Sequence, residues 1–206
     1  MTHTKWIIDN FLKYDHFQLM KDTFPEVEGA GVRAHNDLCS VDPEYRKFIT
    51  KQEGWRRFHN MVFSREFWLP FFPNANLYAY SSSYQEHRTG VMDPKEQRVF
   101  MYSRIDIGVA RAGYGIDNGG KGIHIDNKQR IISGLLYFTD QNLLNGGEFC
   151  FCTPDGRITN KVDVRENRAI ISHQDKDAYH FVNPLKAGVR KFVYFSLNAT
   201  WNFYKR

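Results

Sequence analysis

The sequence predicts a mainly β protein whose helices are confined to its N-terminal third. Up to about residue 75, apolar residues recur at helical spacing, whereas the later part consists of short apolar runs separated by turn residues. Aromatic residues make up 16% of the 206 residues, a share that suits a β-rich core. Many short strands without helices between them favour a sandwich or a barrel. We therefore expect one domain over residues 1–206, with a helical layer over 1–75 and a β core over 76–206.

The N-terminal elements follow from caps and spacing. Asp42-Pro43-Glu44 places an N-cap before a proline in the first helical turn, and Pro25 ends the preceding pattern. Gly54 interrupts the helical pattern before the next apolar face begins at Trp55. We expect a strand over 5–8 and helices over 15–24, from 42 to about 50, and around 55–62. The aromatic run over 67–72 is best explained as packing of this helical layer rather than as a cofactor site.

The β core is divided by glycine, proline and asparagine turns, such as Asn145-Gly146-Gly147. The glycine-rich stretch over 112–122 has no Walker or dinucleotide-binding spacing, so we interpret it as a connection. The expected strands cover residues 77–80, 99–109, 130–138, 147–153, 161–164, 168–172, 178–182 and 189–198.

Bulk composition narrows the classes of partner. The net charge of +5 slightly favours anionic partners, but basic and acidic residues interleave and form no long basic run, so a nucleic-acid surface is not indicated. Cys39, Cys150 and Cys152 are too few for a disulfide framework, and the latter two read as small apolar residues in a strand. The first residues carry no apolar leader and no segment could span a bilayer. These features predict a cytoplasmic protein without a membrane partner.

The motif His124-Ile125-Asp126 is the strongest chemical signal. In an extended strand residues i and i+2 point to the same side, so His124 and Asp126 project together. An imidazole and a carboxylate are two of the three ligands in a facial triad for ferrous iron. On its own the motif is more simply explained as a solvated polar pair at the end of a strand.

A third ligand should come from a later strand, and two histidines are available. His173 lies at the polar end of a strand and looks exposed, whereas His180 sits in the apolar run Ala178-Tyr179-His180-Phe181-Val182 and needs a reason to be there. We select His180. Arg190 opens an apolar strand ten residues later, where its guanidinium could pair with a carboxylate or form an ordinary strand-end salt bridge.

Together, His124-x-Asp126, His180 and Arg190 resemble the Fe(II)- and 2-oxoglutarate-dependent oxygenases, in their prolyl-hydroxylase-like branch. The stretches Gly146-Gly147-Glu148-Phe149 and Glu166-Asn167-Arg168-Ala169-Ile170 carry the same resemblance, which covers residues 109–201. It implies a double-stranded β-helix, a jelly-roll variant that holds the metal at its open end.

The resemblance also implies roles for individual residues. His124, Asp126 and His180 would bind Fe(II), and Arg190 would pair with the distal carboxylate of 2-oxoglutarate, while O2 is the oxidant. Tyr137 matches a tyrosine that contacts the same carboxylate, and Tyr114 or Arg111 is a further candidate for lining this pocket. Because Asp126 is present where related halogenases have a small residue, hydroxylation is the expected outcome.

Two other functions remain open on the sequence. Nucleic-acid demethylases of the same superfamily carry a second arginine shortly after the anchor, and residues 191–199 contain none. A jelly-roll binding module without chemistry would have no use for an inward Arg190, and cupins usually show His-x-His instead of His-x-Asp.

The sequence leaves the substrate open. We expect a small molecule or an amino-acid-like substrate, with a peptidyl proline as the alternative, and the oligomeric state is not predicted. The region over 31–122 offers aromatic and basic candidates for substrate contact, for which ordinary core or surface roles are the simpler account. These candidates are Trp68, Tyr78, Tyr80, Tyr84, His87 and Arg88.

Overall fold

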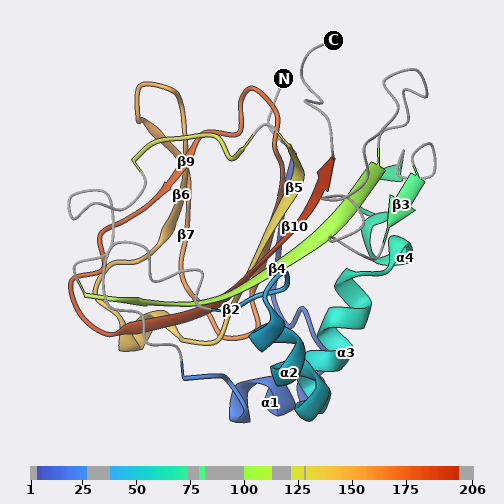
Figure 1. Ribbon diagram of the computed structural model, residues 1–206. Helices are drawn as coiled ribbons and strands as arrows, with labels where there is room; N and C mark the ends of the chain where they lie inside the picture. Colours follow the sequence, from blue (N-terminus) through green and yellow to red (C-terminus); the bar gives the residue numbers. More distant parts are fainter. Residues whose placement is uncertain are drawn as a thin grey trace.

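Two antiparallel sheets and a layer of helices make up the computed structural model of the chain (Figure 1). The structure describes residues 4–26, 38–73, 79–81, 100–112, 122–127 and 129–199. No helix among these residues has the length and apolar character needed to cross a membrane.

The larger sheet has seven strands and is built around the C-terminal strand β10. Its order is β1-β8-β5-β10-β4-β2, and β3 pairs with β4. Strand β10 is antiparallel to both of its neighbours. Phe192 of β10 lies opposite Tyr137 of β5 on one side and opposite Gly108 of β4 on the other. The strands are β1 (Lys5–Ile8), β2 (Leu38–Cys39), β3 (Ala79–Ser81), β4 (Phe100–Arg111), β5 (Arg130–Tyr137), β8 (Ala169–His173) and β10 (Val189–Ala199).

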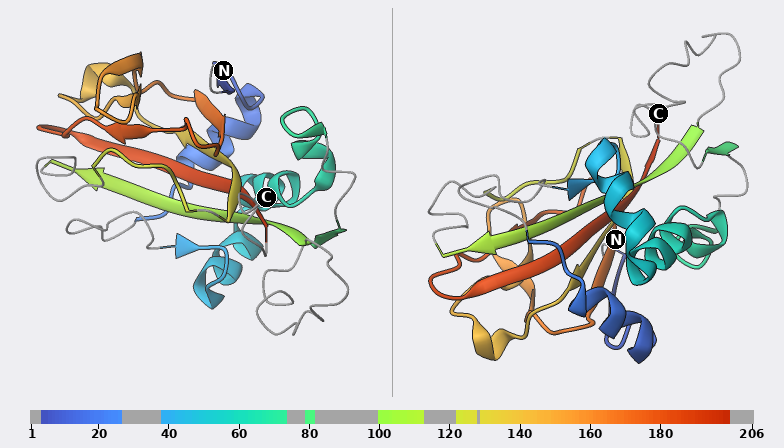
Figure 2. Two further views of the ribbon diagram at one scale, coloured as in Figure 1. Left: turned by 90° about the horizontal axis from the view of Figure 1, so that it is seen from above. Right: turned by 60° about the horizontal axis from the view of Figure 1, so that its bottom comes forward.

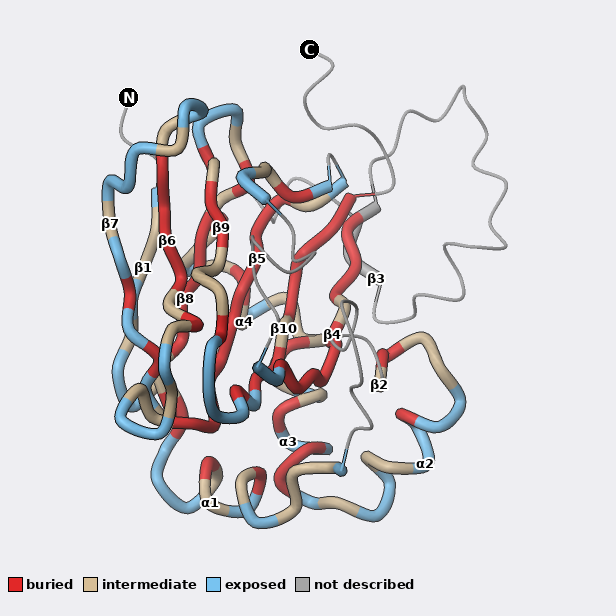
Figure 3. Tube along the Cα trace, turned by 90° about the vertical axis from the view of Figure 1, so that its left-hand side faces the viewer, coloured by how far each residue is buried: buried red, intermediate tan, exposed pale blue. Residues whose placement is uncertain are grey.

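The smaller sheet has the order β7-β6-β9, with β6 (Phe149–Cys152), β7 (Ile158–Val162) and β9 (His180–Val182). The chain passes from β5 in the large sheet to β6 and β7 in the small one, back to β8, across to β9 and back to β10. This alternation winds the strands into a jelly roll, the double-stranded β-helix expected from the resemblance. The central strands are buried, whereas most of β7 is exposed (Figure 3).

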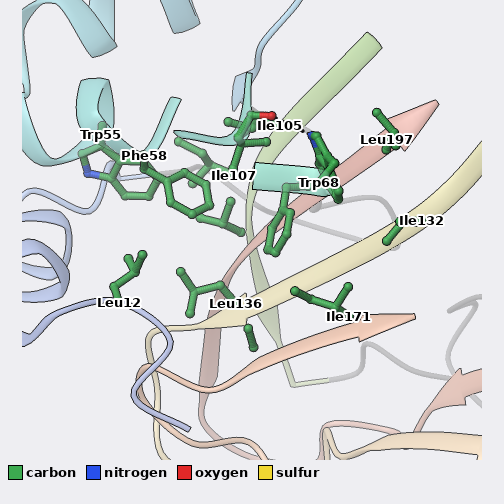
Figure 4. Packing of buried hydrophobic residues seen from close by; sticks show 14 of the residues in the cluster. Leu12, Trp55, Phe58, Trp68, Ile105, Ile107, Ile132, Leu136, Ile171 and Leu197 are labelled. Atoms are coloured by element: carbon green, nitrogen blue, oxygen red, sulfur yellow. Dashed lines mark hydrogen bonds between the residues drawn. The ribbon is translucent and has the colours of Figure 1, made fainter. Parts of the chain in front are cut away.

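The helices cover the outer face of the large sheet (Figure 2). They are α1 (Tyr14–Asp22), α2 (Pro43–Lys51), α3 (Glu53–Val62) and α4 (Arg65–Trp68). The buried Trp55 and Phe58 of α3 and Trp68 of α4 pack against isoleucines and leucines of β4, β5, β8 and β10 (Figure 4). Aromatic residues at helical spacing thus give the helices one apolar face, which is buried on the sheet.

The expected elements are largely present, with two corrections. Gly54 does not interrupt a helix; it lies inside α3, where a side chain would meet Leu19 and the backbone of Met20 at 2.9 Å, so the glycine allows α1 and α3 to pack closely. The break between α2 and α3 falls at Gln52 instead. The run over 67–72 packs in the core as expected.

A buried asparagine joins the segment between β1 and α1 to the β core. Asn167 accepts from the backbone N–H of Leu12 at 2.9 Å and donates to the Leu12 carbonyl at 2.8 Å. Its φ of +57° lies in the left-handed region, which asparagine tolerates better than most residues. Asn167 therefore adopts the left-handed conformation at its own position and pairs the backbone N–H and carbonyl of Leu12, which is distant in the sequence.

Replacing Asn167 by alanine should lower the free energy of unfolding by about 2–4 kcal/mol, since it leaves two buried backbone groups unpaired. Urea denaturation measures this loss. Asn142→Ala, at an exposed position, serves as the control. Equal stabilities of Asn167→Ala and Asn142→Ala would contradict the role of Asn167.

His59 should make stability depend on pH. Burial, aided by the charge of Arg46, lowers the pKa of His59 to about 4, whereas an unfolded histidine titrates near 6.5. Between these values the unfolded chain binds more protons, so this residue's contribution to stability falls as the pH drops from about 6.5 to about 4. His59→Gln should show a shallower fall in urea midpoints over this window. Equal slopes would contradict the assignment.

Candidate metal centre

Two of the predicted ligands are joined through their backbones. His124 donates its N–H to the carbonyl of His180 at 3.1 Å, and His180 donates to the carbonyl of His124 at 3.0 Å. This reciprocal bridge adds the residue-124 segment to the edge of the small sheet beside β9. The side chains of a directly opposed pair lie on the same face, and here the ring centroids are 4.4 Å apart.

Both imidazoles are held in one orientation by a carbonyl two residues upstream. Nδ1 of His124 lies 2.6 Å from the oxygen of Gly122, and Nδ1 of His180 lies 2.9 Å from the oxygen of Ala178. Because a carbonyl only accepts, each Nδ1 carries a proton and each neutral ring keeps a lone pair on Nε2. This is the usual arrangement of a metal-binding histidine, whose second nitrogen donates to a carbonyl or carboxylate.

Asp126 completes the group. Ligand atoms of His124, Asp126 and His180 all lie within 4.8 Å of one another, and Oδ1 of Asp126 is 3.8 Å from Nε2 of His124. The other carboxylate oxygen, Oδ2, is 2.6 Å from the hydroxyl of Ser133 and 2.9 Å from that of Tyr194. The two hydroxyls are 2.6 Å from each other, and the carboxylate charge favours both protons pointing at Oδ2. Oδ2 is thereby occupied, and Oδ1 faces the histidines.

The carboxylate is held in its charged form. Burial alone would raise the pKa of Asp126, but the charge of Arg130 and the hydrogen bond from Ser133 outweigh it and hold the pKa well below its ordinary value. Nη1 of Arg130 lies 2.7 Å from Oδ1. A metal ligand must be deprotonated, so the surroundings of Asp126 prepare it for a cation.

Arg190 and Tyr137 lie further along the same interior face. Phe192 and Tyr194 pack in the cluster between the two sheets, while Val193 and Phe195 face the helices, as the alternation of side chains along a strand requires. Arg190 shares the face of Phe192 and is 3% exposed, and its Nη1 donates to the carbonyl of Gly147 at 2.6 Å.

The hydroxyl of Tyr137 is buried and has no hydrogen-bond partner within the described part of the chain. Burial raises the pKa of Tyr137 to about 12, while the nearby positive charge of Arg190 opposes this rise. A buried hydroxyl without a partner is costly, and a carboxylate placed beside the guanidinium would supply one. The pair therefore fits the distal carboxylate of 2-oxoglutarate.

Other residues singled out in the sequence have different positions. His173 is not exposed: its Nε2 lies 2.6 Å from the carbonyl of Phe71, so it is a structural histidine near the helices. Trp68 is fully buried and donates to the carbonyl of Val62 and to Ser103, which removes it from the substrate candidates. Arg111 is exposed at the end of β4. Tyr114 lies outside the described residues, as do Tyr78, Tyr84, His87, Arg88 and the side chain of Tyr80.

Sequence reasoning missed the three partners of the Asp126 carboxylate, which are Arg130, Ser133 and Tyr194. The alternation of β5 and β10 could have placed Ser133 and Tyr194 on the interior face. Arg130, four residues after Asp126, is the first residue of β5 and carried no signal in the sequence.

Loss of either hydroxyl on Oδ2 should weaken metal binding. We expect Tyr194→Phe and Ser133→Ala each to lower the affinity for Mn(II) about 10- to 100-fold, because the carboxylate then loses one of the two hydrogen bonds that fix Oδ2. Calorimetric titration of the metal measures this. The control, Tyr14→Phe, removes a hydroxyl from a side chain that is 75% exposed and should have no effect. If both variants bind Mn(II) with wild-type affinity, the hydrogen bonds to Oδ2 do not contribute to metal binding and the prediction is wrong.

Comparison with known proteins agrees with this geometry. The family model described as the 2OG-Fe(II) oxygenase superfamily matches residues 109–197, which contain all three members of the cluster as well as Tyr137 and Arg190. No curated protein matches the sequence. Residues 109–197 are therefore similar to the 2OG-Fe(II) oxygenases over the part of the chain that holds the His124, Asp126 and His180 cluster.

Solved structures share the fold at low sequence identity. A prolyl-4-hydroxylase from Pseudomonas putida has a TM-score of 0.52 and 15% identity, with 96% of this chain and 93% of that chain covered. A prolyl 4-hydroxylase from Phytophthora capsici has a TM-score of 0.56 and 16% identity, with 94% and 58% covered. A prolyl hydroxylase from Trichoplax adhaerens, in complex with a peptide fragment of hypoxia inducible factor, has a TM-score of 0.50 and 14% identity, with 96% and 84% covered.

The chain is shorter than some of the proteins it matches. It spans 58% of the Phytophthora chain and 57% of an oxidoreductase of the 2OG-Fe(II) oxygenase family from Burkholderia pseudomallei. Oxygenases of this superfamily use Fe(II), 2-oxoglutarate and O2. The two oriented imidazoles and the ionised carboxylate fit iron, and Arg190 with Tyr137 fits the cosubstrate.

Proposed function

We propose that this chain is a hydroxylase that couples the oxidative decarboxylation of 2-oxoglutarate, to succinate and CO2, to hydroxylation of a small molecule or an amino-acid-like substrate. The observation that carries the proposal is the convergence of His124, Asp126 and His180 with their ligand atoms within 4.8 Å. Two neutral imidazoles and one carboxylate hold iron on one side and leave positions for cosubstrate and oxygen. In this proposal the whole chain acts as a single oxygenase domain.

The roles of the chain's own residues follow from their positions. His124 and His180 offer Nε2 lone pairs, and Asp126 offers Oδ1 while Ser133 and Tyr194 retain Oδ2. Bound iron and 2-oxoglutarate supply the oxidising chemistry, and the protein supplies orientation.

Arg190 would anchor the distal carboxylate of 2-oxoglutarate, and the hydroxyl of Tyr137 would donate to it. The glycine turn beside Arg190 supports this role. Gly146 and Gly147 have φ values of +85° and +84°, and the Gly147 carbonyl accepts from the guanidinium, so the turn fixes the direction of the arginine.

Peptidyl proline hydroxylation is the second candidate. It is favoured by the fold shared with prolyl hydroxylases, one of which is bound to a peptide fragment. A non-catalytic jelly-roll module is the alternative from another class, and the oriented histidine pair argues against it.

A reducing, cytoplasmic location is part of the proposal. All three cysteines are free and buried, and Cys150 and Cys152 lie in β6 as small apolar residues. Such a compartment also keeps iron in the ferrous state.

The proposal is tested without a substrate. Adding Fe(II) and then 2-oxoglutarate to the protein under anaerobic conditions should produce a visible metal-to-ligand charge-transfer band. We expect the band to disappear in His180→Ala, and Arg190→Gln to weaken 2-oxoglutarate binding at least tenfold through loss of a charge-assisted pair. Asp126→Ala should abolish 2-oxoglutarate turnover.

His173→Ala is the matched control, since His173 is the other histidine at a strand end, and this variant should keep the band. A band in His180→Ala equal to that of the wild type would overturn the ligand assignment. Iron binding without a band would overturn the roles of Arg190 and Tyr137.

A further inference from the structure

Arg130 is a positive charge placed directly against the candidate metal ligands. It begins β5, and its Nη1 lies 2.7 Å from Oδ1 of Asp126, the oxygen that faces the histidines. Its guanidinium carbon lies 4.6 Å from the centre of the Tyr194 ring. An ion pair on one side and an aromatic ring on the other fix both the position and the plane of the guanidinium.

The rest of this guanidinium has donors to spare. Nη1 is the one nitrogen of Arg130 that donates to a partner among the described residues, and the side chain is 19% exposed. An arginine has five N–H donors in a planar fork. A group bound by the remaining donors would lie beside Asp126 and hence next to the metal centre.

The neighbouring charges leave Arg130 uncompensated once the site is loaded. Arg104 and Asp106 form a two-point ion pair through Nε and Nη2 of the arginine, so together they are neutral. Tyr194 carries a phenol, which is neutral at neutral pH.

The charges on the loaded site can then be counted. A divalent iron with the guanidiniums of Arg130 and Arg190 brings four positive charges. Asp126 and the 2-oxoglutarate dianion bring three negative ones. Among the groups that the described part of the chain contributes, one positive charge remains, and because Asp126 is then shared with the metal, this charge lies at Arg130.

We propose that Arg130 anchors a carboxylate of the substrate, so that the enzyme acts on a free amino acid or another small carboxylic acid. This inference rests on the proposed function and names its substrate class. A neutral peptide carbonyl would leave the charge of Arg130 unbalanced, whereas a carboxylate balances it and can accept two parallel N–H bonds.

The experiment measures binding to a catalytically inert complex. The protein is loaded with Mn(II) and 2-oxoglutarate without oxygen and titrated calorimetrically with L-leucine, L-proline and L-phenylalanine, each against its own carboxamide. A proline-containing tripeptide with both ends blocked is the peptide probe. In the wild type at least one acid should bind about 10- to 100-fold more tightly than its amide, the range of a charge-assisted pair. In Arg130→Gln this ratio should fall to about one.

The controls separate this role from effects on the metal. Arg165→Gln removes an exposed arginine that pairs with Asp9, and should keep the wild-type ratio. If Arg130→Gln cannot hold Mn(II), Arg130→Lys decides, because lysine keeps the charge beside Asp126 but loses the planar fork. A reduced ratio in Arg130→Lys supports the proposal and an unchanged ratio overturns it.

Other outcomes also overturn the proposal. These are acids that bind no better than amides, a blocked peptide that binds as tightly as the best acid, no binding of any acid, or an undiminished ratio in Arg130→Gln. Loss of 2-oxoglutarate affinity with an undiminished ratio would assign Arg130 to the cosubstrate instead. Failure of the wild type to form the charge-transfer band would refute the proposed function itself, whereas a normal band with no preference for acids refutes this inference alone.

Discussion

The pair of hydrogen bonds between the backbones of His124 and His180 is the constraint on which the site depends. The two residues are 56 positions apart in the chain, and neither belongs to a long strand. The bridge sets them opposite each other at the edge of the small sheet, and their own upstream carbonyls then fix the rings. The ligand geometry is therefore a property of the main chain, and side-chain packing only refines it.

The large sheet contributes the side chains that surround the histidine pair. The interior face of β5 and β10 carries hydroxyls near Asp126 and, about four residues away on each strand, Tyr137 and Arg190. Because the two strands are antiparallel, these displacements run in the same direction, so both residues lie roughly 13 Å of strand away from the level of Ser133 and Tyr194. The outer face of the same strands is apolar and is buried under the helices. The alternation of side chains along β5 and β10 thus places apolar residues in the core under the helices and polar residues in the interior that faces the candidate metal centre.

Much of the fold and of the candidate metal centre was predictable from the sequence, for reasons that differ between elements. Strands such as β10 and β5 were readable because alternation and turn residues agree, and Arg190 could be placed on the interior face by counting. His180 could be preferred over His173 because a histidine in an apolar run needs a partner. The position of Gly54 was misjudged, since the close contact between α1 and α3 that requires a glycine is a tertiary feature. The partners of Asp126 were missed because they meet it only once β5 and β10 lie side by side.

The fixed carboxylate oxygen of Asp126 has a consequence for which ions the centre can accept. With Oδ2 occupied by two hydroxyls, the aspartate offers a single oxygen, and the remaining donors are imidazole nitrogens. Calcium requires six to eight oxygen ligands, so this donor set discriminates strongly against it. Among first-row transition metals, however, the order of intrinsic affinities ranks ferrous iron below cobalt, nickel and copper. Occupancy by iron is therefore decided by metal supply, and protein prepared without control of metals will carry a mixture.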